Sequence, residues 1–217
     1  MGIASTAIAG RIGDAGDATA IGALSIGVAI FNFIYWNCSF IRMGTSGLTA
    51  QAYGSGDQRE MTLMLWRSIT VSLGVGIIAF ALQWPIGEFA LWFMDTGSAD
   101  SHNMISNYFY TRIWAVPAGI MLFAFNGWFT GMQNAVIPMA TAIIVNLIHI
   151  VCSFAFAFGF DLGIVGIAYA SILAQYTGVV LSLVLLRFYF RGYLRNVKWR
   201  EVLSVEPLKE FFRVNRD

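Results

Sequence analysis

The stretch LGIVGIAYASILAQYTGVVLSLVLL, residues 162–186, contains no charged side chain. The hydrocarbon core of a bilayer is about 30 Å thick, and an α-helix of about 20 apolar residues crosses it. This stretch is therefore long enough for one transmembrane helix. Charge-free stretches of the same character lie at residues 18–41, 68–87 and 113–160.

The composition of the whole chain agrees with insertion in a membrane. Of its 217 residues, 58% are hydrophobic and 12% are charged, with a mean hydropathy of +0.68. Soluble domains carry about 25% charged residues. Because lipid cannot satisfy an open backbone, the spanning elements must be helices. The sequence therefore predicts an all-α, polytopic bundle of transmembrane helices in contact with membrane lipid.

The four charge-free stretches predict five spans. Residues 113–160 are too long for one span, and Gly131, Asn134 and Pro138 supply turn and helix-start chemistry within them. The predicted spans are residues 20–45, 62–84, 103–128, 137–158 and 163–188. Residues 1–9 are apolar but too short to span, so we expect them to be the last turns of a helix whose beginning is missing.

Basic residues predict the orientation of the bundle. Eight of the thirteen Lys and Arg residues lie in residues 187–217, whereas the loop predicted at 84–102 has three acidic residues and no basic one. Cytoplasmic segments of membrane proteins carry an excess of Lys and Arg. We therefore expect a multi-pass protein of the inner (plasma) membrane with a cytoplasmic C-terminal tail. The tail from 189 onward is basic and amphipathic, so it predicts either a linker to a further domain or a membrane-surface helix.

His149 is the ionisable residue nearest the middle of a predicted span, in VNLIHIVCSF (145–154). Asn146 and Ser153 lie three residues before it and four after, a spacing that favours one helix face. Histidine titrates near physiological pH and could carry a coupling proton. A neutral imidazole satisfied by a neighbouring helix is an equally good interpretation.

Two arginines fall inside predicted spans. Arg42 lies late in the first span, where it could extend to the interface or face a cavity. Arg112 lies about nine residues into the third span. A charge at that depth is costly and indicates a partner or a hydrated cavity.

Aromatic and amide side chains predict a substrate cavity for flat, cationic or amphiphilic compounds. The full predicted set of cavity residues is Asn32, Tyr35, Trp36, Arg42, Gln51, Arg112, Asn126 and Gln175. No phosphate-binding loop, metal-ligand cluster or catalytic triad stands out, so the sequence predicts neither an enzyme nor a cofactor. Cys38 and Cys152 lie in apolar runs and are interpreted as buried hydrophobic residues. With a net charge of +1, the chain gives no indication of nucleic acid as a partner.

Three segments in order resemble the DinF-like branch of the multidrug and toxic-compound extrusion (MATE) family. They are RMGTSGLTAQAYGSGDQRE (42–60), which closes a span, WFTGMQNAVIPM (128–139), which we interpret as an inside loop, and NLIHIVCSFAFAFGFDLGIVGIAYASILAQY (146–176). The resemblance runs from residue 2 to about 190. It implies a twelve-helix antiporter with two six-helix lobes. Such a protein exports cationic or amphiphilic compounds in exchange for H⁺ or Na⁺.

Under this resemblance, residues 1–188 are an N-terminal lobe without most of its first helix. Residues 189–217 are then a linker toward a second lobe that is absent from the chain. The family's cation site also maps onto particular residues here. Ser5 occupies a position where an aspartate is common, His149 and Ser153 replace an Asn-x-x-x-Asp pair, and Ser171 replaces a threonine. We expect His149 to be the protonatable group, surrounded by Asn146, Ser153 and Ser171.

Two alternatives remain open. Related folds move lipid-linked oligosaccharides, a function that would need a more basic cavity than Arg42 and Arg112 provide. The chain could also be a non-transporting membrane remnant, because one lobe cannot alternate access without a second repeat to move against.

Overall fold

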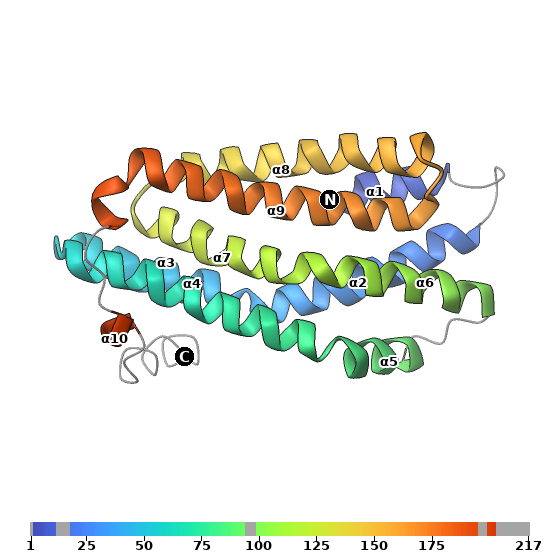
Figure 1. Cartoon of the computed structure of the whole chain (residues 1–217), viewed down its shortest axis with the longest axis horizontal. Helices are drawn as coiled ribbons and strands as arrows, with labels where there is room; N and C mark the ends of the chain where they lie inside the picture. The colour runs from blue at the N-terminus through green and yellow to red at the C-terminus, as the bar shows by residue number, and fades with distance from the viewer. Residues whose placement is uncertain (1, 12–17, 94–98, 195–198, 203–217) are drawn as a thin grey trace. The chain divides into compact units, whose positions relative to one another are not determined.

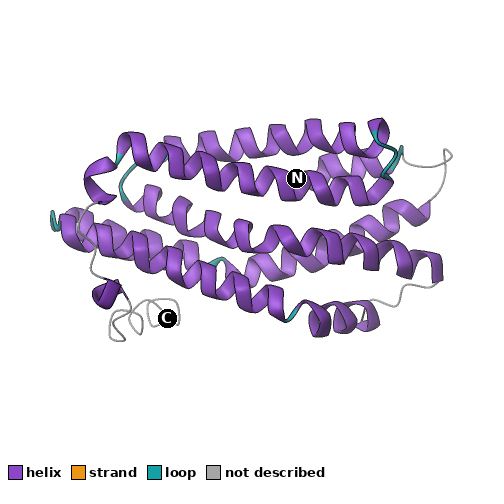
Figure 2. Ribbon diagram, in the orientation of Figure 1, coloured by secondary structure: helices purple, strands orange, loops and turns teal. Residues whose placement is uncertain are grey.

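A computed structural model describes residues 2–11, 18–93, 99–194 and 199–202. Within these ranges every regular element is a helix, as Figure 2 shows. Five helical segments are long and apolar enough to cross a membrane: Ile21–Gly54, Gln58–Ala81, Ser101–Gly131, Val136–Gly159 and Gly163–Tyr189. The prediction of an all-α bundle with five spans is therefore confirmed. The short apolar N-terminal segment is helix α1 (Gly2–Ala9).

The first span is longer than predicted, because helix α2 (Ala18–Cys38) is followed directly by α3 (Phe40–Gly54). The sequence predicts the end of this span at residue 45. The structure instead buries Thr45, Leu48 and Thr49 within α3. Small side chains in this segment allow close helix packing. The helix ends before Gly56, whose φ of +72° suits glycine.

Helix α4 (Gln58–Ala81) begins with a cap, in which the backbone N–H of Glu60 donates to Asp57 Oδ1 at 3.0 Å. The prediction of a loop from residue 84 to 102 is wrong at both ends, because α5 (Gln83–Phe93) is helical and residues 99–102 belong to the next helix. Pro85 fits in the first turn, where a missing N–H leaves no bond unmade. At 11 residues, α5 is too short to give a transmembrane signal.

The third span consists of α6 (Ala99–Arg112), one 3₁₀ turn and α7 (Val116–Gly131). The predicted break near residues 131–138 is confirmed as a short turn, which is tighter than the loop expected at 128–139. Here the Ile137 N–H donates to Asn134 Oδ1 at 3.1 Å, at the start of α8 (Val136–Phe154). A π-helical turn at Ala155–Gly159 ends that span, and α9 (Gly163–Tyr189) is the fifth.

The helices labelled in Figure 1 divide into two compact units. Unit 1 comprises residues 1–36, 78–116 and 144–177, and unit 2 comprises residues 37–77, 117–143 and 178–217. In unit 1, the fully buried side chains include Leu24, Phe31, Ile105, Phe109 and Ile167.

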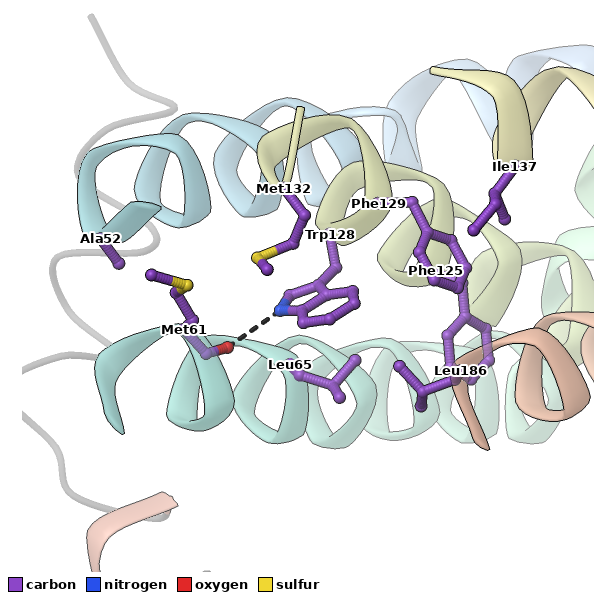
Figure 3. Close-up of a cluster of buried hydrophobic side chains, with 9 residues drawn as sticks. All are labelled: Ala52, Met61, Leu65, Phe125, Trp128, Phe129, Met132, Ile137 and Leu186. Atoms are coloured by element: carbon purple, nitrogen blue, oxygen red, sulfur yellow. Dashed lines mark hydrogen bonds between the residues drawn. The ribbon is translucent and has the colours of Figure 1, made fainter. Parts of the chain in front are cut away.

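An aromatic cluster forms the core of unit 2 (Figure 3). Trp128 of α7 is fully buried at its centre, between Met61 and Leu65 of α4 and Leu186 of α9. Its indole Nε1–H donates to the backbone oxygen of Met61 at 2.9 Å. This bond satisfies the one polar atom of the side chain, as burial of tryptophan requires.

Helix α8 has a polar buried face and an apolar exposed face. Its buried residues recur every fourth position: Ile137, Thr141, Val145, His149 and Ser153, followed by Ala157 in the π turn. The exposed face carries Ile143, Leu147, Val151 and Phe154. A water-soluble helix has the opposite arrangement. The pattern fits a helix with lipid against its exposed side.

The tail begins with a 3₁₀ turn at Arg191–Leu194 and continues, after residues that lie outside the description, as α10 (Trp199–Val202). Most of the predicted linker, residues 195–198 and 203–217, lies outside the described residues. Its role as a linker stays a prediction.

Candidate functional site

The predicted proton site lies in unit 1, where the second half of α8 lies beside the first half of α9 (Figure 1). His149 is 1% exposed, and its Nε2 lies 3.1 Å from Ser171 Oγ. The Ser171 hydroxyl in turn donates to the backbone oxygen of Ile167 at 3.0 Å. A hydroxyl has only one proton to donate. The arrangement therefore assigns the donor role to His149 Nε2–H and the acceptor role to Ser171.

In this tautomer, Nδ1 of His149 is an acceptor, and it makes no hydrogen bond to the described part of the chain. Ser153, one turn further along α8, is fully buried, and its Oγ is also unpartnered among the described residues. Buried polar atoms without a partner are uncommon and call for an explanation. A ring nitrogen and a hydroxyl on one buried face of α8 have the chemistry to bind a proton or a small cation.

The remaining predicted members of this site are placed differently. Ser5 of α1 is buried in the same unit. Asn146 is exposed. Of the three polar residues predicted to share one face of α8, only His149 and Ser153 therefore lie together on the buried face. The reason is geometric. Consecutive helical residues are about 100° apart, and the buried face passes through Val145 at this level of the helix.

Arg112 is the second buried polar feature of unit 1. It is 7% exposed, and its Nη1 donates to the hydroxyl of Tyr108, four residues earlier on α6. The guanidinium lies over two ring faces, at 4.8 Å from the centroid of Phe31 and 5.4 Å from that of Tyr108. Arg112 Nε is buried and has no hydrogen-bond partner among the described residues.

These contacts compensate only part of the cost of burying the charge. A cation–π contact contributes about 0.5–2 kcal/mol, whereas removing an ion from water costs several kcal/mol even after relaxation. In the described residues both ion pairs lie in unit 2, and neither involves Arg112. Sequence reasoning identified Arg112 but missed Tyr108 and Phe31. The spacing of four residues between Tyr108 and Arg112 was an available signal for the first of them.

The predicted cavity residues are divided between the two units. Asn32, Tyr35, Trp36 and Gln175 belong to unit 1 together with Arg112, and Trp36 is 75% exposed. Arg42, Gln51 and Asn126 belong to unit 2, where Arg42 and Gln51 are exposed. Asn126 Oδ1 is buried and makes no hydrogen bond to a described residue. Their common role as a substrate cavity stays a prediction.

The described residues contain no group of three or more His, Cys, Asp or Glu side chains able to hold a metal ion. Both cysteines are free thiols; Cys38 is buried and Cys152 is half-buried. Membrane-length helices, an apolar exposed face on α8 and buried polar groups within the spans together define a polytopic membrane protein. His149 and Arg112 are buried within these spans, and ionisable residues in such positions are candidates for a function.

Comparison with known proteins assigns the family. The MatE family model matches residues 1–155, and the chain belongs to this family. DNA damage-inducible protein F of Escherichia coli (strain K12) is 26% identical over 205 residues, covering 92% of this chain and 44% of that protein. The probable multidrug resistance protein NorM of Thermotoga maritima is 23% identical over 194 residues, covering 82% of this chain and 42% of that protein.

Solved structures confirm the fold. A MATE transporter crystallised in a bent conformation superposes with a TM-score of 0.86 at 20% identity, covering 99% of this chain and 47% of that one. A MOP superfamily transporter from Pyrococcus furiosus, described as having a binding pocket of reverse polarity, gives a TM-score of 0.82 at 21% identity, covering 99% of this chain and 46% of that one. The chain thus spans about half the length of the relatives it matches. Its fold corresponds to a single transporter lobe, and these relatives are transporters rather than enzymes.

Proposed function

We propose that this chain forms one lobe of a secondary active transporter, which exports cationic or amphiphilic compounds in exchange for H⁺ or Na⁺. The observation that carries the proposal is the buried His149–Ser171 pair between two membrane-length helices of a MATE fold. An ionisable residue in such a position is a functional candidate by default, because burying it in a membrane is costly.

His149 is the proton carrier of this proposal. Its Nε2–H is held by Ser171, whereas Nδ1 is left as an unpartnered acceptor. A proton arriving at Nδ1 therefore breaks no hydrogen bond that the described residues make. Ser153 on α8 and Ser5 on α1 are the buried residues that we expect around the bound ion, whereas Asn146, which the sequence also predicted there, is exposed.

The second lobe is the partner of this proposal. Transporters built from repeats alternate access by rocking one repeat against another around a central site. A single lobe lacks that movement, so the transport assay uses the complete product of the gene that encodes this chain.

We expect that product in the inner membrane with residues 189–217 in the cytoplasm. A reporter fused after Asp217, active only in the cytoplasm, tests this orientation.

The test of function is export driven by an imposed gradient in proteoliposomes, with a fluorescent organic cation as the probe. We expect a pH gradient to drive export by the wild-type protein, and His149→Gln to abolish the effect of the gradient. His102→Gln is the matched control, since His102 is the other histidine and is exposed on α6. Undiminished pH-driven export by His149→Gln would exclude His149 as the proton carrier.

The same assay separates the other functions. Export that responds to Na⁺ but not to pH would indicate that Na⁺, and not H⁺, is the coupling ion bound at this site. Movement of a lipid-linked oligosaccharide with no export of the dye would favour a flippase. No movement of either compound, from a protein that folds and inserts, would indicate a membrane remnant.

A further inference from the structure

Unit 1 holds a buried cation that the described part of the chain leaves without an anion. We propose that Arg112 receives the carboxylate or phosphate oxygens of an amphiphilic substrate, so that amphiphiles with an anionic group are among the compounds that this lobe handles. The inference rests on the proposed transport function and specifies its substrate class.

Two arginines are buried among the described residues, and they differ in the groups that compensate their charge. Arg67 of α4 is 4% exposed and has a carboxylate partner, because its Nη1 donates to Glu60 Oε1 at 2.5 Å. Its Nη2 also donates to the backbone oxygen of Glu201 at 3.3 Å. A buried arginine with such partners has the contacts of a structural ion pair.

Arg112 has no carboxylate partner among the described side chains. Its contacts with described residues are one hydrogen bond, to the neutral hydroxyl of Tyr108, and the ring faces of Phe31 and Tyr108. The acidic residues of unit 1 whose side chains the structure describes are Glu88 and Asp161, both exposed and neither in an ion pair with Arg112. The guanidinium thus keeps N–H donors for an incoming group.

The surroundings of the guanidinium favour an oxyanion attached to an apolar body. A guanidinium presents paired N–H groups that match carboxylate and phosphate oxygens. Phe31 and Tyr108, whose ring faces the guanidinium contacts, are buried, and Phe31 is in turn stacked on the buried Phe109 at 5.4 Å between centroids. These ring faces provide few groups that could replace the water molecules bound to a small inorganic ion. They offer apolar contact to the body of an amphiphile.

The test measures binding of two dyes that differ at one group. Rhodamine 110 carries a free carboxylate, and rhodamine 123 is its methyl ester. Each dye is titrated by fluorescence anisotropy against the full chain in nanodiscs of neutral phosphatidylcholine. We expect the wild-type chain to bind rhodamine 110 more tightly. Arg112→Gln should weaken that binding by about tenfold to a hundredfold and leave rhodamine 123 unchanged.

Two further variants keep the test decisive. Arg112→Lys retains the charge without the planar fork, and we expect an intermediate loss for rhodamine 110 only. Arg187→Gln removes an exposed arginine at the end of α9 and should change neither dye. Equal affinity of the wild type for both dyes, or equal weakening of both by Arg112→Gln and Arg112→Lys, would overturn the inference.

The source of the anion and the proposed function are tested separately. If anionic phosphatidylglycerol in the nanodisc displaces rhodamine 110, then a lipid headgroup occupies the site and the substrate assignment is wrong. Carboxylate-dependent binding without any export by the complete gene product would reject transport but keep the Arg112 site. Gradient-driven export of rhodamine 110 that Arg112→Gln leaves unchanged would reject the site but keep transport.

Discussion

Arg59 and Glu201 are 142 residues apart in the chain, yet Arg59 Nη2 donates to both carboxylate oxygens of Glu201 at 2.7 Å. The contact joins the start of α4 to α10 within unit 2. The buried Arg67 adds a bond from Nη2 to the backbone oxygen of Glu201. One exposed and one buried arginine of α4 thus hold the same residue of the tail.

This relationship predicts that charge reversal releases the α10 segment. Arg59→Glu places two carboxylates together, so we expect faster amide hydrogen exchange at residues 199–202. The double variant Arg59→Glu with Glu201→Arg restores opposite charges and should return the exchange rate toward wild type. The fold should be little affected, because exposed ion pairs contribute little to stability. Exchange that is equally fast in the single and double variants would show that the pair does not hold the segment.

Helix α7 packs against α3 through two glycines, which gives a second prediction. A Cβ at Gly127 would lie 2.6 Å from the backbone oxygen of Arg42. A Cβ at Gly131 would lie 2.5 Å from the Cβ of Thr49. Backbone atoms cannot move aside without separating the helices. We expect Gly127→Ala and Gly131→Ala each to destabilise the protein by about 1–3 kcal/mol, measured by unfolding in detergent.

The matched control for these glycines is Gly74→Ala on α4 of the same unit, where a Cβ would meet nothing within 4 Å. That substitution should be neutral or stabilise the helix by up to about 1 kcal/mol. If Gly74→Ala and Gly127→Ala destabilise alike, then the loss reflects glycine flexibility and not the close approach of α3.

Hydropathy predicted the five spans because exclusion of charge from the bilayer acts on each helix by itself. It missed α5, whose 11 residues are too few to give that signal. It ended the first span early, at residue 45. The continuation of the helix through α3 depends on its packing against Gly127 and Gly131 of α7. Only tertiary structure supplies that information.

The candidate site was predictable in part for the same reason. His149 and Ser171 were identified from the sequence and its resemblance to a family, and the structure places their polar atoms 3.1 Å apart. The exposure of Asn146 depends on how the buried face turns along α8, which periodicity alone did not resolve. The position of Arg112 beside Phe31 required the packing of α2 against α6, two helices far apart in the sequence.

Gly27 of α2 allows Tyr108 to reach Arg112, which gives a third prediction. A Cβ at Gly27 would lie 2.5 Å from Tyr108 Cδ1 and 2.7 Å from Cε1, so the ring would have to move. We expect Gly27→Ala to destabilise the protein by about 1–3 kcal/mol and to weaken binding of rhodamine 110. Gly22→Ala on the same helix meets nothing within 4 Å and is the control. Unchanged stability and dye binding in Gly27→Ala would refute this packing role.

Ser171 holds the proton of His149 Nε2, which gives the final prediction. Ser171→Ala leaves that N–H unpaired at a residue only 1% exposed, so we expect a loss of about 1–3 kcal/mol in unfolding free energy. Ser182→Ala is the matched control, because Ser182 is also buried on α9 and its Oγ has no hydrogen-bond partner among the described residues. Removing an unpaired hydroxyl should cost nothing. Both variants are compared by unfolding in detergent. Equal losses would mean that the Ser171 hydroxyl contributes only its volume, and that His149 finds its hydrogen-bond partner elsewhere.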